Sequence, residues 1–139
     1  MKTGLVAIEP AGWAAPRGYA NGMLAPPGGR LLFIAGQVGW NARQELVEGG
    51  FAVQFEQALA NIVEVVKTAG GRPEHLGRLT IYVTDRSEYR DRLKEVGQAY
   101  RSIMGRHFPA MTLVEVQALL EPGARVEIEG TAVIPAGPG

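Results

Sequence analysis

The sequence predicts an α/β fold in which two helices pack on one face of a mixed β-sheet. Apolar residues recur at steps of three and four within 51–68 and again within 89–103, the period of amphipathic helices. Segments before, between and after these stretches alternate apolar and polar residues, the period of strands. Because each helix bridges two strands, we expect crossover connections on one face of the sheet. At 139 residues, the chain has the length of a single domain, 1–139.

The first fifty residues predict short strands joined by turns. Residues Leu5–Ile8 form a short apolar segment typical of a strand. The segments 19–25 and 31–35 flank Pro26-Pro27-Gly28-Gly29, which suits a tight turn. We therefore expect these two segments to pair as a hairpin, and we expect residues 36–50 to be irregular.

The first helix is predicted over residues 51–68. Its apolar stripe consists of Phe51, Phe55, Leu59, Ile62 and Val66. Gly70-Gly71 and Pro73 follow, and this combination ends a helix.

A strand and a second helix follow. Residues 76–84 alternate apolar and polar side chains and predict the strand. Asp85 and Glu88 have the spacing of a capping box, so the second helix should begin there and run to about Gly105. Its expected buried stripe is Tyr89, Leu93, Val96, Tyr100 and Ile103.

The last two predicted strands, 109–115 and 126–129, carry several carboxylates. Glu121-Pro122-Gly123 lies between them, so we expect a hairpin centred near Pro122. That register sets Glu115 opposite Glu129 and Gln117 opposite Glu127. Like charges directly opposed across a sheet are destabilising, so we interpret the carboxylates as a functional cluster. A solvated face, or a water-filled axis between subunits, is the plainer interpretation.

The sheet face away from the helices has no predicted element to cover it. We expect Val133, Leu113 and Leu119 on this face, beside the glutamates. Self-association of several copies is the simplest way to bury such a face. A site at the subunit boundary would then be natural.

Charge and composition argue against several classes of function. The chain has 14 basic and 14 acidic residues, and the basic residues within 86–95 alternate with acidic ones, so nothing favours a nucleic-acid partner. No apolar stretch is long enough to span a bilayer, so we expect no membrane partner. The N-terminal segment lacks the apolar core of a signal peptide, and we therefore expect a cytoplasmic protein.

The sequence contains no pattern that would hold a metal ion or a cofactor. Without cysteine there is neither a thiolate zinc site nor a cysteine nucleophile. His75 and His107 lack ligand spacing, and the glycines within 18–50 match no phosphate-binding fingerprint. We therefore expect no metal and no cofactor.

Five segments, in order along nearly the whole chain, form one combined pattern. They are Gly18-Tyr19-Ala20-Asn21-Gly22, Ala35-Gly36-Gln37, Ala69-Gly70-Gly71, Tyr82-Val83-Thr84-Asp85 and the two final strands. Together they resemble the RidA/YjgF superfamily, the reactive intermediate deaminases. The resemblance implies a chorismate-mutase-like α/β fold and a homotrimer whose sheets surround a central barrel core. It also implies three ligand clefts between subunits, which agrees with the need to cover the bare sheet face.

The resemblance also implies an activity, from which one position departs. Family members hydrolyse small imines and enamines, such as 2-iminopropionate, to a keto acid and ammonia. The family's arginine, which holds the substrate carboxylate, is Met111 in this chain. A guanidinium binds a carboxylate through two parallel hydrogen bonds that a thioether cannot imitate. Leu113 stands for a frequent cysteine, Ala35 for a serine and Gly97 for an asparagine.

Other positions match the family cleft. Tyr19, the backbone at Gly36 and Glu127 are retained, and Glu127 matches a glutamate that can position water. We therefore expect Glu127 to be the catalytic residue, with His107 as a candidate general acid. Tyr19 is also compatible with an ordinary place at the rim, because tyrosine is amphipathic.

Two functions remain open. The first is a RidA-like enamine or imine deaminase whose substrate is larger or less acidic than 2-iminopropionate, with Arg101 or Arg106 as a possible displaced cation. The alternative is a non-catalytic member that binds a small metabolite at the subunit interface. The apolar wall would comprise Trp40, Phe108, Met111 and Leu113, although Trp40 also suits a packing role and Met111 a gap-filling one. The candidate ligand-binding residues are Tyr19, Ala35, Gly36, Trp40, His107, Phe108, Met111 and Leu113.

Overall fold

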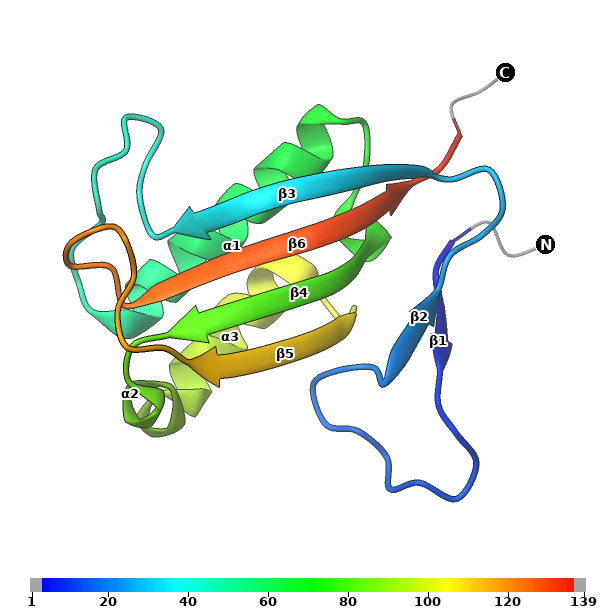
Figure 1. Cartoon of the computed structure of the whole chain (residues 1–139), viewed down its shortest axis with the longest axis horizontal. Helices are drawn as coiled ribbons and strands as arrows, with labels where there is room; N and C mark the ends of the chain where they lie inside the picture. The colour runs from blue at the N-terminus through cyan, green and yellow to red at the C-terminus, as the bar shows by residue number, and fades with distance from the viewer. Residues whose placement is uncertain (1–3, 137–139) are drawn as a thin grey trace.

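A computed structural model describes residues 4–136 of the chain (Figure 1). Residues 1–3, part of the N-terminal segment considered above, and residues 137–139 lie outside this range. The centre is a four-stranded sheet in the order β3 (Arg30–Val38), β6 (Val126–Ile134), β4 (Leu76–Val83), β5 (Ala110–Glu115). Strand β6 is antiparallel to both neighbours, whereas β4 and β5 are parallel. The predicted mixed α/β fold is confirmed.

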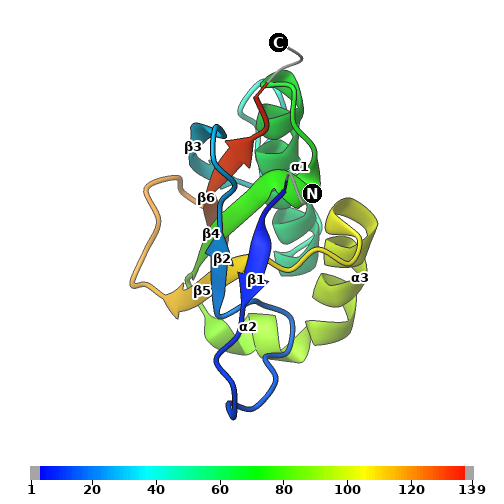
Figure 2. The same ribbon diagram turned by 90° about the vertical axis from the view of Figure 1, so that its right-hand side faces the viewer.

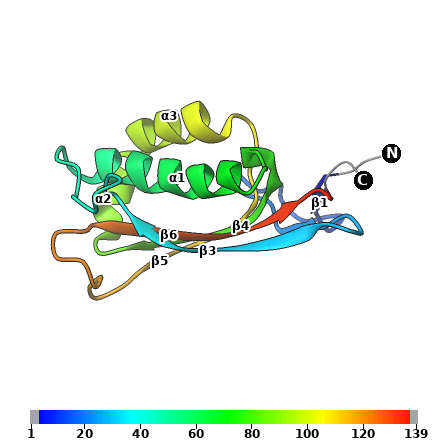
Figure 3. The same cartoon turned by 90° about the horizontal axis from the view of Figure 1, so that it is seen from above.

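Three helices cover one face of this sheet: α1 (Phe51–Thr68), α2 (Arg86–Asp91) and α3 (Leu93–Met104) (Figure 3). Their apolar side chains form one core with the facing side chains of the strands. Burial of this apolar surface is the main term that favours folding. The most deeply buried large side chains include Phe55, Leu59, Ile62, Leu76, Leu79 and Ile128.

Helix α1 has the bounds that the sequence predicts. All five residues of its predicted apolar stripe are buried. Gly70 ends the helix in the left-handed region at φ 88°, and the Gly71 N–H donates to the carbonyl of Val66 at 2.9 Å. Gly71 also lets the chain pass close to the core, because a Cβ there would lie 2.5 Å from Ile134 Cδ1.

The second predicted helix is in fact two helices, broken at Arg92, where φ is −116°. Asp85 caps α2 by accepting a hydrogen bond from the Ser87 N–H at 2.9 Å. The expected capping box is absent, because Glu88 forms an ion pair with Arg125 instead. Leu93 begins α3 directly after the break and is 55% exposed, so its predicted burial is wrong.

Both predicted hairpins are also wrong. Strand β4 lies between β5 and β6, so the strands on either side of the Pro122 turn do not pair with each other. Strand β2 (Gly22–Leu24) pairs with β1 (Val6–Ile8) in a separate ribbon rather than with β3 (Figure 2). An alternating pattern reports which face a side chain takes, but it does not identify the neighbouring strand. Strand β3 also continues to Val38, into the segment expected to be irregular.

The sheet face opposite the helices carries apolar side chains beside the glutamates. Val133 lies on this face as expected and pairs with Leu31, which is 62% exposed; Phe33 on the same strand is 77% exposed. Leu113 was expected there but packs against the core on the helix side, and Leu119 lies in the loop between β5 and β6. Within residues 4–136, no helix covers this face (Figure 3).

Candidate functional site

Glu127, the predicted catalytic residue, lies on the uncovered face of the sheet. Its neighbours on β6, Val126 and Ile128, are fully buried on the helix side, so the strand period directs Glu127 the other way. Strand β3 passes so close that a Cβ at Gly36 would lie 2.9 Å from Glu127 Cδ. Gly36 therefore makes the room that the Glu127 side chain occupies.

Glu129 lies on the same face, but its carboxylate already accepts a hydrogen bond. The Tyr82 hydroxyl donates a hydrogen bond to Glu129 Oε1 at 2.5 Å. This hydrogen bond is the main reason why the pKa of Tyr82 is raised above its ordinary value. Among the described residues, hydrogen bonds reach the side-chain carboxylates of Glu129 and Glu115, but none reaches the carboxylate of Glu127. Of the three carboxylates, Glu127 is thus the one available to a water molecule or a ligand.

The predicted cluster of opposed carboxylates is wrong. Glu115 ends β5 opposite Val83 of β4, and its carboxylate accepts a hydrogen bond from the Arg86 N–H at 2.9 Å. The insertion of β4 between β5 and β6 separates Glu115 from Glu129. The pair that does share one face is Glu127 and Glu129, two residues apart on one strand.

Met111 lines a small pocket between α3 and β5, with a volume of about 280 Å³. It packs against the core on the helix side of the sheet, as Leu113 does. The Phe108 ring forms part of the same pocket and stacks on Tyr100, with ring centroids 5.2 Å apart. Arg101 contributes to the lining from α3. Met111 and Glu127 of one chain therefore lie on opposite faces of the sheet.

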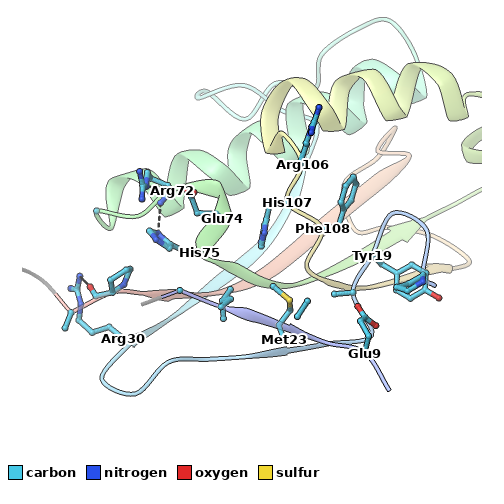
Figure 4. Close-up of a pocket in the computed structure, with 18 residues that line it drawn as sticks. Glu9, Tyr19, Met23, Arg30, Arg72, Glu74, His75, Arg106, His107 and Phe108 are labelled. Atoms are coloured by element: carbon cyan, nitrogen blue, oxygen red, sulfur yellow. Dashed lines mark hydrogen bonds and ion pairs between the residues drawn. The ribbon is translucent and has the colours of Figure 1, made fainter. Parts of the chain in front are cut away.

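A larger cleft of about 1030 Å³ lies between the N-terminal ribbon and the body of the protein (Figure 4). Tyr19, His107 and Phe108 line it together with Arg106, so these predicted residues do come together. The His107 ring donates its Nε2–H to the carbonyl of Leu76 at 2.7 Å, since a carbonyl can only accept. Among the described residues, no hydrogen bond reaches its Nδ1.

His75, which the sequence did not single out as a site residue, lines the same cleft. Its Nδ1 accepts a hydrogen bond from the Arg72 N–H at 2.9 Å. Burial lowers the pKa of His75; Glu74 opposes this shift, while Arg72 and His107 add to it. His75 therefore favours the neutral form and acts as an acceptor that fixes the turn at 73–75.

Trp40 and Ala35 lie away from the pocket under α3. Trp40 follows β3, at the sheet edge opposite β5, and its carbonyl accepts a hydrogen bond from Asn61 Nδ2 at 2.8 Å. Ala35 is exposed on β3, directly before Gly36. The structure therefore does not bring Trp40, Met111 and Phe108 into one apolar wall within a single chain.

The predicted site thus divides into two groups. Glu127, Gly36 and Ala35 belong to β6 and the adjoining part of β3, whereas Met111, Phe108, His107 and Tyr19 line the two pockets near the start of β5. Sequence reasoning missed the aromatic side chains that surround Met111, because Tyr89 and Tyr100 were interpreted only as core residues. The position of Tyr100, three residues after Gly97 on the same helix, was the available signal.

Residues 4–136 contain neither a metal-binding cluster nor a membrane-spanning helix. No group of three or more His, Asp or Glu side chains in this range is arranged to hold a metal ion. Within the same range, no helix has the length and apolar character needed to cross a membrane.

Comparisons with known proteins give one consistent result. A family model described as Endoribonuclease L-PSP matches residues 13–134. A 2-iminobutanoate/2-iminopropanoate deaminase from Bos taurus is 36% identical over 105 residues, which are 75% of this chain and 73% of that protein. The protein of the same name from Homo sapiens is 32% identical over 105 residues, with the same shares of the two chains.

Solved structures show the same similarity. YyfB of Yersinia pestis, a Rid-family protein of unknown function, superposes with a TM-score of 0.82 at 36% identity, and covers 94% of this chain and 98% of its own. RidA of a Psychrobacter species superposes with a TM-score of 0.65 at 29% identity, and covers 87% of this chain and 92% of its own.

Proposed function

Because the chain belongs to the RidA/YjgF family, whose model spans residues 13–134, we propose that it is an enamine or imine deaminase. The observation that carries this proposal is the Glu127 carboxylate, which lies against the backbone of Gly36 and accepts no hydrogen bond among the described residues. A carboxylate in this state can bind and activate a water molecule. The similar proteins that are named 2-iminobutanoate/2-iminopropanoate deaminase support the reaction class, but they do not identify the substrate of this chain.

The reaction needs one water molecule and a proton carrier. Water adds to the carbon of the C=N bond, and Glu127 accepts a proton from that water. The proton then passes to the nitrogen and gives a carbinolamine. Glu127 next takes the proton of the new hydroxyl group and delivers it to the nitrogen as the C–N bond breaks, which releases ammonia and leaves a carbonyl product. One carboxylate can perform both transfers, because it is regenerated in its ionised form at the end of the cycle.

We further propose that the working site combines two copies of the chain in a homotrimer. The uncovered face presents Glu127 beside exposed apolar side chains, Leu31 and Phe33 among them. Met111 and Phe108 line a pocket on the other side of the sheet. A second copy packed on the uncovered face would bring its own pocket to Glu127 and would bury the apolar surface. The ligand cleft would then lie between subunits.

The test is the release of ammonia from a panel of imines by the wild type and by Glu127→Gln. We expect kcat to fall by about 100- to 10,000-fold, the usual contribution of a general acid–base. Glu129→Gln is the matched control, because Glu129 lies two residues away on the same face. A fall in kcat for Glu129→Gln, with normal kcat for Glu127→Gln, would contradict the role proposed for Glu127 and would point to Glu129 instead.

A non-catalytic binding protein is the second candidate, and Met111 favours it. No cation projects from β5 at this position, so a small imino acid would lack an obvious partner there. Thermal-shift screening with keto acids, aromatic acids and amines distinguishes the two functions. A compound that raises the melting temperature and is recovered unchanged supports binding alone, whereas its conversion supports the deaminase.

A further inference from the structure

The pocket between α3 and β5 has a guanidinium at its rim. Arg101 on α3 lines this pocket together with Met111 and Phe108, and its side chain is exposed. Gly97, one helical turn earlier, has no side chain to cover the surface beside the pocket. A Cβ at Gly97 would lie 3.2 Å from Arg101 Nη1, so the guanidinium extends back over the position where a side chain would otherwise lie.

No carboxylate within the described residues forms an ion pair with this cation. Residues three and four positions away on a helix are the natural ion-pair partners, and for Arg101 these are Gly97, Gln98, Met104 and Gly105. Across residues 4–136, the ion pairs involve Arg43, Arg72 and Arg125 but not Arg101. The guanidinium can therefore bind an external anion without first breaking an internal ion pair.

The rest of the pocket is apolar and aromatic. Tyr89, Tyr100 and Phe108 present rings to it, and the Tyr100 hydroxyl is occupied by the hydrogen bond that it donates to the carbonyl of His107 at 2.6 Å. Leu93 and Met111 add aliphatic surface. The volume of about 280 Å³ accommodates a phenyl ring or a branched alkyl group, and is larger than a methyl group needs.

We propose that this pocket binds a small carboxylate with an aromatic or branched apolar body, and that Arg101 holds the carboxylate. A guanidinium offers two parallel N–H donors to a carboxylate, and the aromatic walls bury the apolar body. The identification of the natural ligand as a 2-imino acid with a bulky side chain rests on the proposed function. Carboxylate binding itself does not, because it needs only the pocket and Arg101.

Arg106 is the competing cation near the end of α3. It lines the larger cleft, beside His107, and is not part of the lining of this pocket. Its removal should therefore leave ligand binding under α3 unchanged.

The experiment measures the affinity of three probes by titration calorimetry: phenylpyruvate, pyruvate, which lacks the apolar body, and phenylacetone, which lacks the carboxylate. Phenylpyruvate should bind more tightly than either truncated probe. Arg101→Gln should weaken phenylpyruvate binding by about 10- to 100-fold, the value of a charge-assisted hydrogen-bonded pair. It should leave phenylacetone binding unchanged. Arg90→Gln, an exposed arginine of α2, is the matched control, and Arg106→Gln tests the competing cation.

The outcomes separate this proposal from the deaminase activity. Binding of phenylpyruvate that depends on Arg101, without hydrolysis of any imine, leaves the pocket assignment standing and removes the deaminase. Imine hydrolysis with the same KM for aromatic substrates in Arg101→Gln and the wild type overturns the pocket assignment alone. An absence of phenylpyruvate binding, or an equal loss in Arg90→Gln, also overturns it. Circular dichroism confirms that each variant is folded.

Discussion

Gly36 shows how the absence of one side chain positions the candidate carboxylate. The space that a Cβ would need at this position is filled by the end of the Glu127 side chain. The contact involves the flexible end of the glutamate rather than backbone, so a methyl group at Gly36 would displace the carboxylate more readily than it would disturb the sheet.

Gly36→Ala should therefore lower activity without unfolding the protein. We expect kcat to fall by about 10- to 100-fold, because a displacement of about 1 Å misaligns a catalytic group. The free energy of unfolding should change by less than about 1 kcal/mol, since Glu127 can rotate away. Gly77→Ala is the control, because a Cβ there meets Leu5 at an ordinary 3.5 Å. Full activity in Gly36→Ala would show that the position of Glu127 does not matter.

At the same scale, the sequence identified candidate site residues but could not predict which of them would meet. Glu127 and Tyr19 follow from short segments that resemble the family, so their positions can be read from local sequence. Arg101 and Met111 are ten positions apart, and only the packing of α3 against β5 brings them to one pocket. The separation of Glu115 from Glu129 likewise depends on β4, which the local sequence of neither glutamate encodes.

At the scale of elements, α1 anchors the loop that leads into β6. The buried Gln54 side chain donates to the carbonyl of Gly123 at 3.1 Å and accepts from the Arg125 N–H at 2.8 Å. These two hydrogen bonds fix the chain just before it enters the sheet. They add to the turn at Glu121–Ala124, where the Ala124 N–H donates to the carbonyl of Glu121 at 3.1 Å, near the end of a loop of ten residues, 116–125.

Gln54→Ala should destabilise the fold by about 1–3 kcal/mol, because it removes the side-chain partner of two partly buried backbone groups. Urea denaturation measures the change. Gln98→Ala is the matched control: Gln98 is exposed on α3, and its replacement should change stability by less than about 0.5 kcal/mol. Equal midpoints for the two variants would show that the loop needs no anchor.

Elements that depend on nearby residues could be predicted from the sequence, whereas those that depend on contacts between distant segments could not. The bounds of α1 follow from a regular apolar stripe and two glycines, which are local features. The break at Arg92 carries no Gly or Pro, so the sequence offered no signal for it. The strand order depends on contacts between distant segments, and alternation alone could not identify it.

At the scale of the whole molecule, the two groups of the proposed site lie on opposite sides of one chain's sheet. Glu127 lies on the uncovered face, and the pocket of Arg101 and Met111 lies under α3. In a ring of identical copies, each contact joins two different surfaces. The face that carries Glu127 in one copy can therefore meet the pocket of Arg101 and Met111 in the next copy. The sequence predicted a bare face, but only the fold shows that the pocket lies on the other side.

Subunit mixing tests this two-copy site most directly. Glu127→Gln and Arg101→Gln are each expected to hydrolyse an aromatic 2-imino acid poorly at low substrate concentration, since one lacks the acid–base group and the other the anion partner. After the two proteins are unfolded together and refolded, mass spectrometry should detect mixed trimers. Activity should then rise to roughly a quarter of the wild-type rate, because about one cleft in four receives an intact half from each parent. Mixed trimers with no more activity than the average of the parents would contradict a site shared between copies.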